Sequence, residues 1–279
     1  MKQAETEESP QKSLLSGVLD KVPGARRIVH SSFVRRAAGR VLGRYPLRRT
    51  LAGSGVCYEI RDMENFYSAE ELFRRELYRG AFRDPISTFI DLGANCGYFA
   101  CYVAHRANGR QIKGMLVEAN DLLIPVARRH VELNDLRDVT VIHGLIGRGD
   151  SREDHGELVL SDAHTSSSQS GEHPHAQWKG FSRKIKVPFV NVFQEWCSRF
   201  GPLKIDLLKI DIEGSEEIFL AETPSVLPLC EKVVVECHKW IVDRRKVFER
   251  LEKEGLFFQQ TFEVDEWFET ALFSRRGKV

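Results

Sequence analysis

The segment LLKIDIEGSE, residues 207–216, carries charged side chains at a spacing that suits proton-transfer chemistry. It opens as an apolar run, and because side chains alternate along a strand, Lys209 and Asp211 share one face of it. Glu213 follows in the turn that ends the run. A carboxylate can accept or share a proton, and a nearby ammonium can lower the pKa of an acidic group. The alternative is a structural ion pair between Lys209 and Glu213 that fixes the turn.

The segment VVVECH, residues 233–238, adds Glu236 and His238 on one face of a second apolar run. Histidine exchanges a proton near neutral pH and is the natural base of such a group, although a hydrogen-bonded structural histidine is an equal alternative. Two carboxylates and a histidine can also bind a divalent cation. Nothing in the spacing requires a metal, so we expect none.

The segment ISTFIDLGANCGYF, residues 86–99, indicates a nucleotide site, because a glycine-rich turn separates an apolar run from a helical pattern. Its spacing is D-x-G-x-x-x-G, from Asp91, Gly93 and Gly97, whereas dinucleotide sites use G-x-G-x-x-G. Asn95 stands where a pyrophosphate turn would need glycine. Gly93 permits a tight turn, and Gly97 lets a helix begin close to the sheet.

The acid in this turn favours a cationic ligand over a phosphate. Asp91 would repel a phosphate and attract an ammonium group. Glu118 follows about 20 residues later, where an acid binds the hydroxyls of a nucleoside ribose. His143 and Gly144, at the end of the next apolar run, can flank an adenine. These features predict S-adenosylmethionine; the alternative for Asp91 and Glu118 is a capping or solvated acid.

A sheet must bring these segments together. From residue 86 onward, short apolar runs alternate with helical patterns, which predicts a doubly wound α/β domain with a mostly parallel sheet. The expected strands are Ile86–Asp91, Ile112–Glu118, Val139–His143, Ile205–Asp211 and Lys232–Cys237. The expected helices are residues 97–107, 121–133, 215–221 and 240–254.

Two features interrupt this alternation. Leu256–Phe262 and Thr270–Ser274 predict a terminal antiparallel pair, a topology typical of methyltransferases that use S-adenosylmethionine. Residues 147–180 form a polar insertion rich in serine and histidine. Its flanking segments, GELVL and RKIKVPFV, are expected to pair as an outer hairpin, and long insertions of this kind often cover a site.

The N-terminal region is polar and then basic. We expect a disordered tail at residues 1–13, a helical extension at 14–65 and the methyltransferase domain at 66–279. Residues 21–50 hold nine Lys or Arg and no acid, and include a basic amphipathic helix. Such a helix can lie on an anionic membrane or an acidic partner, or pack on the domain with its basic face solvated.

Composition excludes several classes of protein. Of the 279 residues, 42% are apolar and 29% charged, and the net charge of +1 predicts no partner by itself. No apolar run is long enough to span a membrane, and the N-terminus lacks the features of a signal. Six cysteines form no CxxC pair, which predicts reduced thiols in a cytoplasmic protein. Composition does not predict the oligomeric state.

Over roughly residues 66–275 the chain resembles the FkbM family of methyltransferases, in four segments that keep the family's order and spacing. These segments are FIDLGANCGYF, LVEAN, LLKIDIEGSEE and VVVECH. The resemblance implies a class I methyltransferase fold, which is Rossmann-like, with S-adenosylmethionine as donor. It also implies methylation of a hydroxyl on a secondary metabolite or a glycan. The residues that it places at the cofactor are Asp91, Gly93, Asn95, Gly97 and Glu118.

We therefore expect an O-methyltransferase that aligns an acceptor oxygen with the methyl group and removes its proton. Asp211 is expected to contact the methyl centre or the acceptor, and Glu213 to orient the acceptor. Lys209 is expected to pair with these acids or to lower the acceptor's pKa, and His238 to act as base.

Two other classes remain open: a catalytically inactive methyltransferase-like scaffold, and an NAD-type oxidoreductase, which the missing glycine pattern disfavours. A nucleic-acid substrate is not expected, because DIEG stands where base-flipping enzymes carry NPPY.

Overall fold

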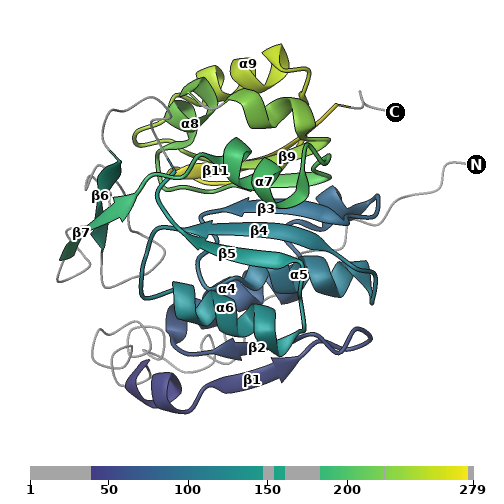
Figure 1. The fold of residues 1–279 in the computed structure, drawn as a ribbon, viewed down its shortest axis with the longest axis vertical. Helices are drawn as coiled ribbons and strands as arrows, with labels where there is room; N and C mark the ends of the chain where they lie inside the picture. The colour runs from purple at the N-terminus through teal and green to yellow at the C-terminus, as the bar shows by residue number, and fades with distance from the viewer. Residues whose placement is uncertain (1–38, 147–153, 161–182, 223, 276–279) are drawn as a thin grey trace, which may run out of the picture. The chain divides into compact units, whose positions relative to one another are not determined.

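The computed structural model describes residues 39–146, 154–160, 183–222 and 224–275. Within these ranges the main sheet has seven strands in the order β10-β11-β9-β8-β3-β4-β5 (Figure 1). The strands from β9 to β5 run parallel, whereas β11 is antiparallel to both β9 and β10. The strands are β3 (Thr88–Leu92), β4 (Lys113–Glu118), β5 (Val139–His143), β8 (Leu207–Ile210), β9 (Lys232–His238), β10 (Phe257–Val264) and β11 (Phe268–Ser274). The predicted fold, a mostly parallel doubly wound sheet with an antiparallel C-terminal strand, is confirmed.

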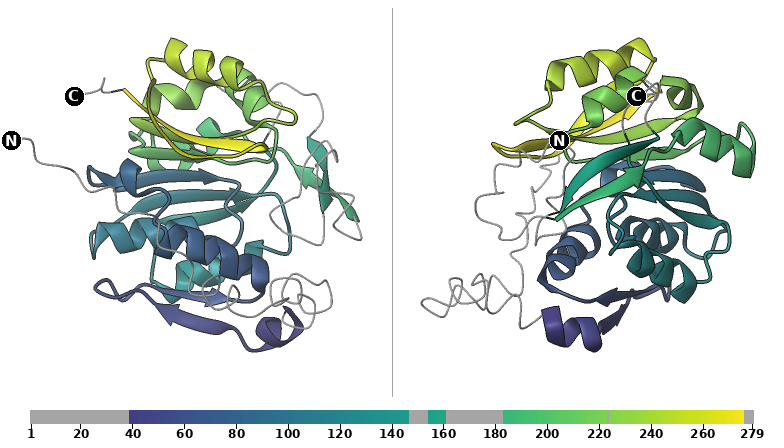
Figure 2. Two further views of the ribbon diagram at one scale, coloured as in Figure 1. Left: turned by 180° about the vertical axis from the view of Figure 1, so that it is seen from behind. Right: turned by 60° about the vertical axis from the view of Figure 1, so that its left-hand side comes forward.

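Helices cover both faces of this sheet (Figures 1 and 2). One layer contains α5 and α6, and the other contains α7, α8 and α9. The helices are α5 (Tyr98–Ala107), α6 (Ile124–Leu133), α7 (Val192–Phe200), α8 (Glu216–Glu222) and α9 (Arg244–Lys253). Short 3₁₀ turns lie at Arg79–Phe82 and Pro224–Leu229.

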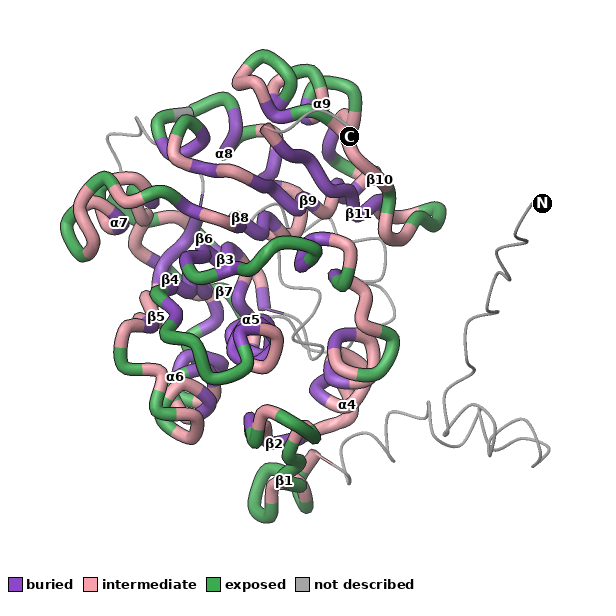
Figure 3. Tube along the Cα trace, turned by 90° about the vertical axis from the view of Figure 1, so that its right-hand side faces the viewer, coloured by how far each residue is buried: buried purple, intermediate pink, exposed green. Residues whose placement is uncertain are grey.

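The central strands are apolar throughout because both of their faces are covered. Every residue of β3 and β8 is buried, as the purple central strands of Figure 3 show. Ile90 belongs to the same core cluster as Trp196 of α7, while Phe89 packs against Phe99 of α5. This explains why the strands appear in the sequence as continuous apolar runs rather than as alternating patterns.

The strand order reverses at β3, which lies between β4 on one side and β8 on the other. Chains that leave two such neighbouring strands diverge to opposite faces of the sheet. The carboxyl ends of β3 and β8 therefore border the crevice where open α/β sheets bind ligands. Asp91 and Asp211 lie at these two strand ends.

The insertion is flanked by an antiparallel hairpin, as predicted. β6 (His155–Leu160) pairs with β7 (Arg183–Pro188), and Leu158 and Val187 are buried in a small separate core cluster. Most of the polar insertion between the two strands, and the residues just before β6, lie outside the described residues.

Two parts of the chain differ from expectation. The predicted helical extension at residues 14–65 contains a strand pair, β1 (Leu47–Thr50) and β2 (Cys57–Ile60), because Gly53 and Gly55 adopt positive φ and turn the chain back. Helix α7 was not predicted. Its signal is the Asn191 side chain, which accepts a hydrogen bond from Gln194 N and caps an amphipathic segment.

The chain divides into two compact units. The smaller comprises residues 1–48 and 59–77, and its described part contains helix α4 (Met63–Ala69), which continues into a π-helical turn, Glu70–Arg74. Asp62 caps α4 by accepting a hydrogen bond from Asn65 N. The larger unit, residues 49–58 and 78–279, contains the main sheet. The expected tail at residues 1–13 and most of the basic segment lie outside the described residues.

The state of the cysteines and the character of the helices can be compared with what composition predicted. All six cysteines are free thiols. Over the ranges that the structure describes, no helix combines the length and apolar character that a membrane crossing requires.

Gly93 allows β3 and β8 to approach closely, and this close packing can be tested. Its φ is +76°, and a Cβ atom at this position would overlap the backbone carbonyl oxygen of Asp211. Gly109 has a similar φ of +83° but nothing within 4 Å of its ideal Cβ. We expect Gly93→Ala to lower the free energy of unfolding by about 2–4 kcal/mol, and Gly109→Ala by only about 1 kcal/mol. Urea denaturation measures both values, and equal losses would contradict the close packing of the two strands.

Candidate active site

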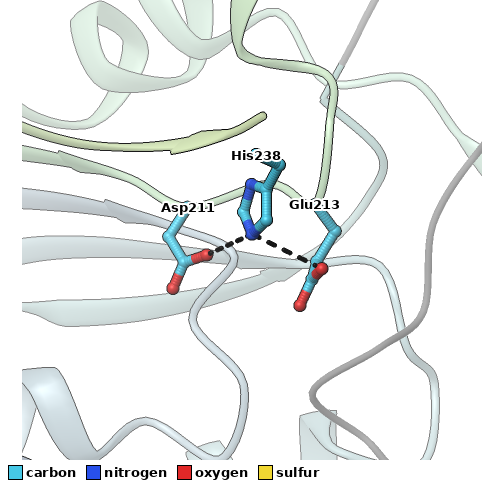
Figure 4. Close-up of side chains that lie close together, drawn as sticks. All are labelled: Asp211, Glu213 and His238. Carbon is cyan, nitrogen blue, oxygen red and sulfur yellow. Dashed lines mark ion pairs between the residues drawn. The ribbon is translucent and has the colours of Figure 1, made fainter. Parts of the chain in front are cut away.

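The candidate site lies at the carboxyl ends of the parallel strands. Asp91 is the penultimate residue of β3, Glu118 ends β4 and His143 ends β5, while Asp211 follows β8 and His238 ends β9. The structure brings the four predicted catalytic residues into one connected group. Within it, the side chains of Asp211, Glu213 and His238 converge (Figure 4).

Lys209 links the carboxylate of Asp91 to that of Asp211. The register of the sheet pairs it with Asp91 on the neighbouring strand, and its Nζ lies 3.2 Å from Asp91 Oδ1 and 3.0 Å from Asp211 Oδ2. Burial acts to lower the pKa of Lys209, but the two carboxylates outweigh it and hold the pKa well above its ordinary value. The ammonium group is therefore a fixed positive charge between two acids.

Asp91 is fully buried and keeps unused capacity to accept hydrogen bonds. Burial raises its pKa to about 6, and the Lys209 ammonium opposes that rise. No described residue reaches Oδ2 of Asp91 with a hydrogen bond. An unsatisfied carboxylate oxygen in the interior is costly, and a ligand that donates an N–H group to it would remove the cost. The ammonium of an aminoacyl ligand fits this requirement.

Glu118 stabilises the glycine-rich turn through hydrogen bonds to the backbone. Its Oε2 accepts a hydrogen bond of 2.7 Å from Asn95 N, and its Oε1 one of 2.7 Å from Asn120 N. Asn95 adopts a left-handed conformation with φ of 49°. Burial raises the pKa of Glu118, and the backbone N–H groups oppose this rise. A carboxylate oxygen can accept more than one hydrogen bond, so both oxygens can still receive ribose hydroxyls.

The structure also shows what Gly97, Gly144 and His143, the other residues expected at the cofactor, contact within the protein. A Cβ on Gly97 would lie 3.1 Å from Ala127 Cα, so this glycine lets α5 begin close to α6. A Cβ on Gly144 would overlap the side chain of Val190. His143 Nε2 lies 3.1 Å from the carbonyl oxygen of Ala119. Their contact with a cofactor stays a prediction.

His238 lies at the centre of four carboxylates. Its Nδ1 is 2.7 Å from Glu216 Oε1. Its Nε2 is 3.4 Å from Glu236 Oε1, 3.5 Å from Glu213 Oε2 and 3.8 Å from Asp211 Oδ1. Burial acts to lower the pKa of the imidazole, but Glu216 and the other acids raise it well above its ordinary value. A raised pKa favours the protonated imidazole, and the expected role of His238 as base stays a prediction.

Glu213 is a second member of this group whose pKa departs strongly from its ordinary value. Burial raises its pKa well above the ordinary range; the Asp211 and Glu236 charges add to the rise, and His238 opposes it. Glu213 also has a positive φ of 51°, an uncommon conformation for a residue with a side chain. A carboxylate whose pKa is raised toward neutrality is a better proton acceptor than an ordinary one.

Two acids that complete the group were not selected as site residues from the sequence. Glu216, the first residue of α8, is fully buried, and its Oε1 accepts hydrogen bonds of 3.2 Å from Ile212 N and Gly214 N. Glu236 accepts a hydrogen bond of 3.0 Å from Thr270 Oγ1, and burial raises its pKa. Glu236 was visible as a partner of His238 on the same strand face, but no spacing indicates the contact of Glu216.

The buried Asp91 predicts a specific dependence of stability on pH. Its pKa rises from 3.8 to about 6 on folding. The contribution of protonated Asp91 to the free energy of unfolding is therefore fully present below pH 3.8 and is lost as the pH rises through 6. At pH 7 the loss is about 3 kcal/mol. Asp91→Asn, which stays neutral, should raise the unfolding free energy of the ligand-free protein by up to that amount at pH 7, and the gain should shrink toward pH 4.

Urea denaturation between pH 4 and pH 7.5 measures this difference, with Asp138→Asn as a control at a partly exposed surface acid. The control should change stability by less than about 0.5 kcal/mol at every pH. A loss of stability in Asp91→Asn at pH 7 would contradict the prediction, because it would mean that the Lys209 ion pair outweighs the cost of burial.

Several solved structures are similar to this chain at low sequence identity. Solved structures similar to the chain include TrmK of M. capricolum in complex with S-adenosyl-homocysteine, at 10% identity and a TM-score of 0.44, covering 72% of this chain and 67% of that one. A SAM-dependent methyltransferase from Aquifex aeolicus matches at 13% identity and a TM-score of 0.41, covering 74% and 92%. Similarity at this level carries no conclusion about function. No match was found among curated proteins.

The family assignment rests on sequence. The Methyltransferase FkbM domain matches residues 91–275, from the acid near the end of β3 to the residue after β11. The match includes Asp91, Glu118, Lys209, Asp211 and His238, and S-adenosyl-L-methionine is accordingly the cofactor of the domain. The chain belongs to the FkbM family of methyltransferases.

Proposed function

We propose that this methyltransferase transfers the methyl group of S-adenosylmethionine to a hydroxyl group of a small molecule or a glycan. The observation that carries the proposal is the position of Lys209. Its ammonium lies 3.2 Å from Asp91, at the cofactor strand, and 3.0 Å from Asp211, at the edge of the acidic group around His238. One buried charge thus joins the donor side of the site to a group that can take a proton from an acceptor.

The residues of the chain divide into a donor side and an acceptor side. On the donor side, Asp91 would hold the aminoacyl ammonium and Glu118 the ribose hydroxyls. The bound cofactor supplies an electrophilic methyl group on a sulfonium. On the acceptor side, Asp211 would orient the incoming hydroxyl, and the carboxylates of Glu213 and Glu236 can accept its proton. The raised pKa values of these two glutamates suit that task.

The acidic character of the site favours oxygen over nitrogen as the acceptor atom. Carboxylates close to an amine raise its pKa and keep it protonated, and an ammonium group has no lone pair for methyl transfer. A hydroxyl group instead donates a hydrogen bond to a carboxylate and becomes more nucleophilic. The same charge disfavours nucleic acid, because the phosphate backbone would meet Asp211, Glu213 and Glu236.

The six free thiols support a reducing compartment, and we place the protein in the cytoplasm on that ground. The basic segment at residues 21–50 stays a candidate contact for an anionic membrane or an acidic partner.

Methyl transfer itself tests the proposal. The purified protein is incubated with radiolabelled S-adenosylmethionine and with separate small-molecule, glycan, protein and RNA fractions. We expect label in the small-molecule or glycan fraction, and we expect it to survive mild base, because a methyl ether is stable where a methyl ester is hydrolysed. Glu213→Gln should lower the rate by about 10²–10⁴-fold, since it removes a proton acceptor.

Glu217→Gln is the matched control, because Glu217 is a neighbouring acid that pairs with the exposed Lys246. Its rate should equal that of the unmodified protein. Label found only in RNA or in protein would contradict the proposed acceptor. Binding of S-adenosylhomocysteine without transfer to any fraction would favour a catalytically inactive binding subunit.

A further inference from the structure

The side chains of Asp211, Glu213 and His238 present their ligand atoms at the spacing of a metal site. One oxygen from each acid and one imidazole nitrogen lie within 4.8 Å of one another. An octahedral ion with bonds of about 2.1 Å separates its ligand atoms by about 3.0 Å when they are adjacent and about 4.2 Å when they are opposite. Closing the three atoms onto one ion therefore needs only small side-chain movements.

The imidazole nitrogen that faces these acids makes only long contacts with them, the shortest being a long hydrogen bond with Glu236. Its three oxygen neighbours, from Asp211, Glu213 and Glu236, lie at 3.8, 3.5 and 3.4 Å. All three distances exceed the 2.7–3.2 Å of a good N–H to oxygen hydrogen bond, and one N–H group can satisfy only one oxygen well. The carboxylates surround the space in front of Nε2 without closing on it, although the His238 side chain is only 3% exposed.

The opposite nitrogen of the ring is fixed in the manner of a metal-binding histidine. Nδ1 lies 2.7 Å from Glu216 Oε1, and that oxygen is held in turn by the backbone N–H groups of Ile212 and Gly214. A carboxylate behind a histidine fixes the ring orientation and directs the other nitrogen toward the ion. Glu216 is thus a positioning residue, independent of the three ligands.

We propose that Asp211, Glu213 and His238 bind one divalent transition-metal ion, and that this ion holds and activates the acceptor hydroxyl. The role of the ion in methyl transfer rests on the proposed function, whereas the binding of the ion to the protein does not. Two carboxylates favour a hard cation, and an imidazole favours a transition metal. Mn²⁺ satisfies both preferences and is the ion we assign.

With the ion bound, the acceptor oxygen, the methyl group and the proton each have a defined partner in the reaction. The acceptor oxygen binds the ion, which lowers the pKa of its hydroxyl. The oxygen then forms a bond to the methyl carbon while the carbon–sulfur bond breaks, and the electron pair of that bond stays on sulfur as a neutral thioether. Because Glu213 is then a ligand of the ion, the proton passes to Glu236, the other of the two proton acceptors named above, which lies outside the three ligands.

Electron paramagnetic resonance tests the site without any assay of activity. Mn²⁺ is titrated into the full-length, chelator-treated protein, and loss of the signal of the free ion reports binding. We expect one ion per chain, with affinity at least about tenfold weaker in Glu213→Gln and in His238→Gln. Glu217→Gln is again the control, and its affinity should be unchanged. Circular dichroism verifies that each variant is folded.

A second measurement needs no variant. Electron spin echo envelope modulation of the Mn²⁺-loaded protein should show coupling to one imidazole nitrogen. Absence of binding up to about 1 mM Mn²⁺, which corresponds to about −4 kcal/mol, would overturn the proposal, and so would binding without nitrogen coupling. Methyl transfer that persists in excess chelator would overturn the role of the ion and leave the methyltransferase function intact. Mn²⁺ binding in a protein that fails to bind S-adenosylhomocysteine would instead contradict the proposed function alone.

Discussion

The buried ammonium of Lys209 between Asp91 and Asp211 is the interaction on which the rest of the site depends. A charge in the protein interior is tolerated only with partners, and here one cation serves two carboxylates on neighbouring strands. The parallel register of β3 and β8 sets Asp91 opposite Lys209, and Gly93 allows the backbone after β8 to pass close by. The cofactor side and the acceptor side are therefore linked by the pairing of the sheet and not by a flexible loop.

The positive charges of the site do not fully offset the effect of burial on its acids. Asp91 keeps a raised pKa in spite of Lys209, and Glu213 and Glu236 keep theirs in spite of His238. In a ligand-free protein such a group of buried acids costs stability. The sulfonium and ammonium of the cofactor and a bound divalent ion are all cations, and each would offset part of this cost. We propose that recognition of positively charged ligands is the reason for an arrangement that costs stability in the ligand-free protein.

Much of the fold and part of the site follow from the sequence. Strands buried on both faces give continuous apolar runs, so the strands ending at Asp91, Glu118 and His143 were predictable. Parallel strands end at one edge of a sheet, so the acids after those runs were expected to lie together. The turn at Gly53 and Gly55 lies within the predicted helical extension and was not expected from the sequence. The contact of Glu216 with His238 joins α8 to β9, and no periodicity within a single element indicates it. The raised pKa of His238 depends on acids from several elements and could not be predicted from one strand.

The most direct test is calorimetric titration of the ligand-free protein with S-adenosylhomocysteine, comparing the unmodified chain with Asp91→Asn. If the buried carboxylate of Asp91 exists to hold the cationic aminoacyl group, the variant should bind at least about tenfold more weakly, because it loses a charged hydrogen bond worth about 1.5–3 kcal/mol. NAD should not bind either protein. Equal affinity of the two proteins for S-adenosylhomocysteine would contradict this role of Asp91, and would mean that the ion pair with Lys209 serves the fold alone.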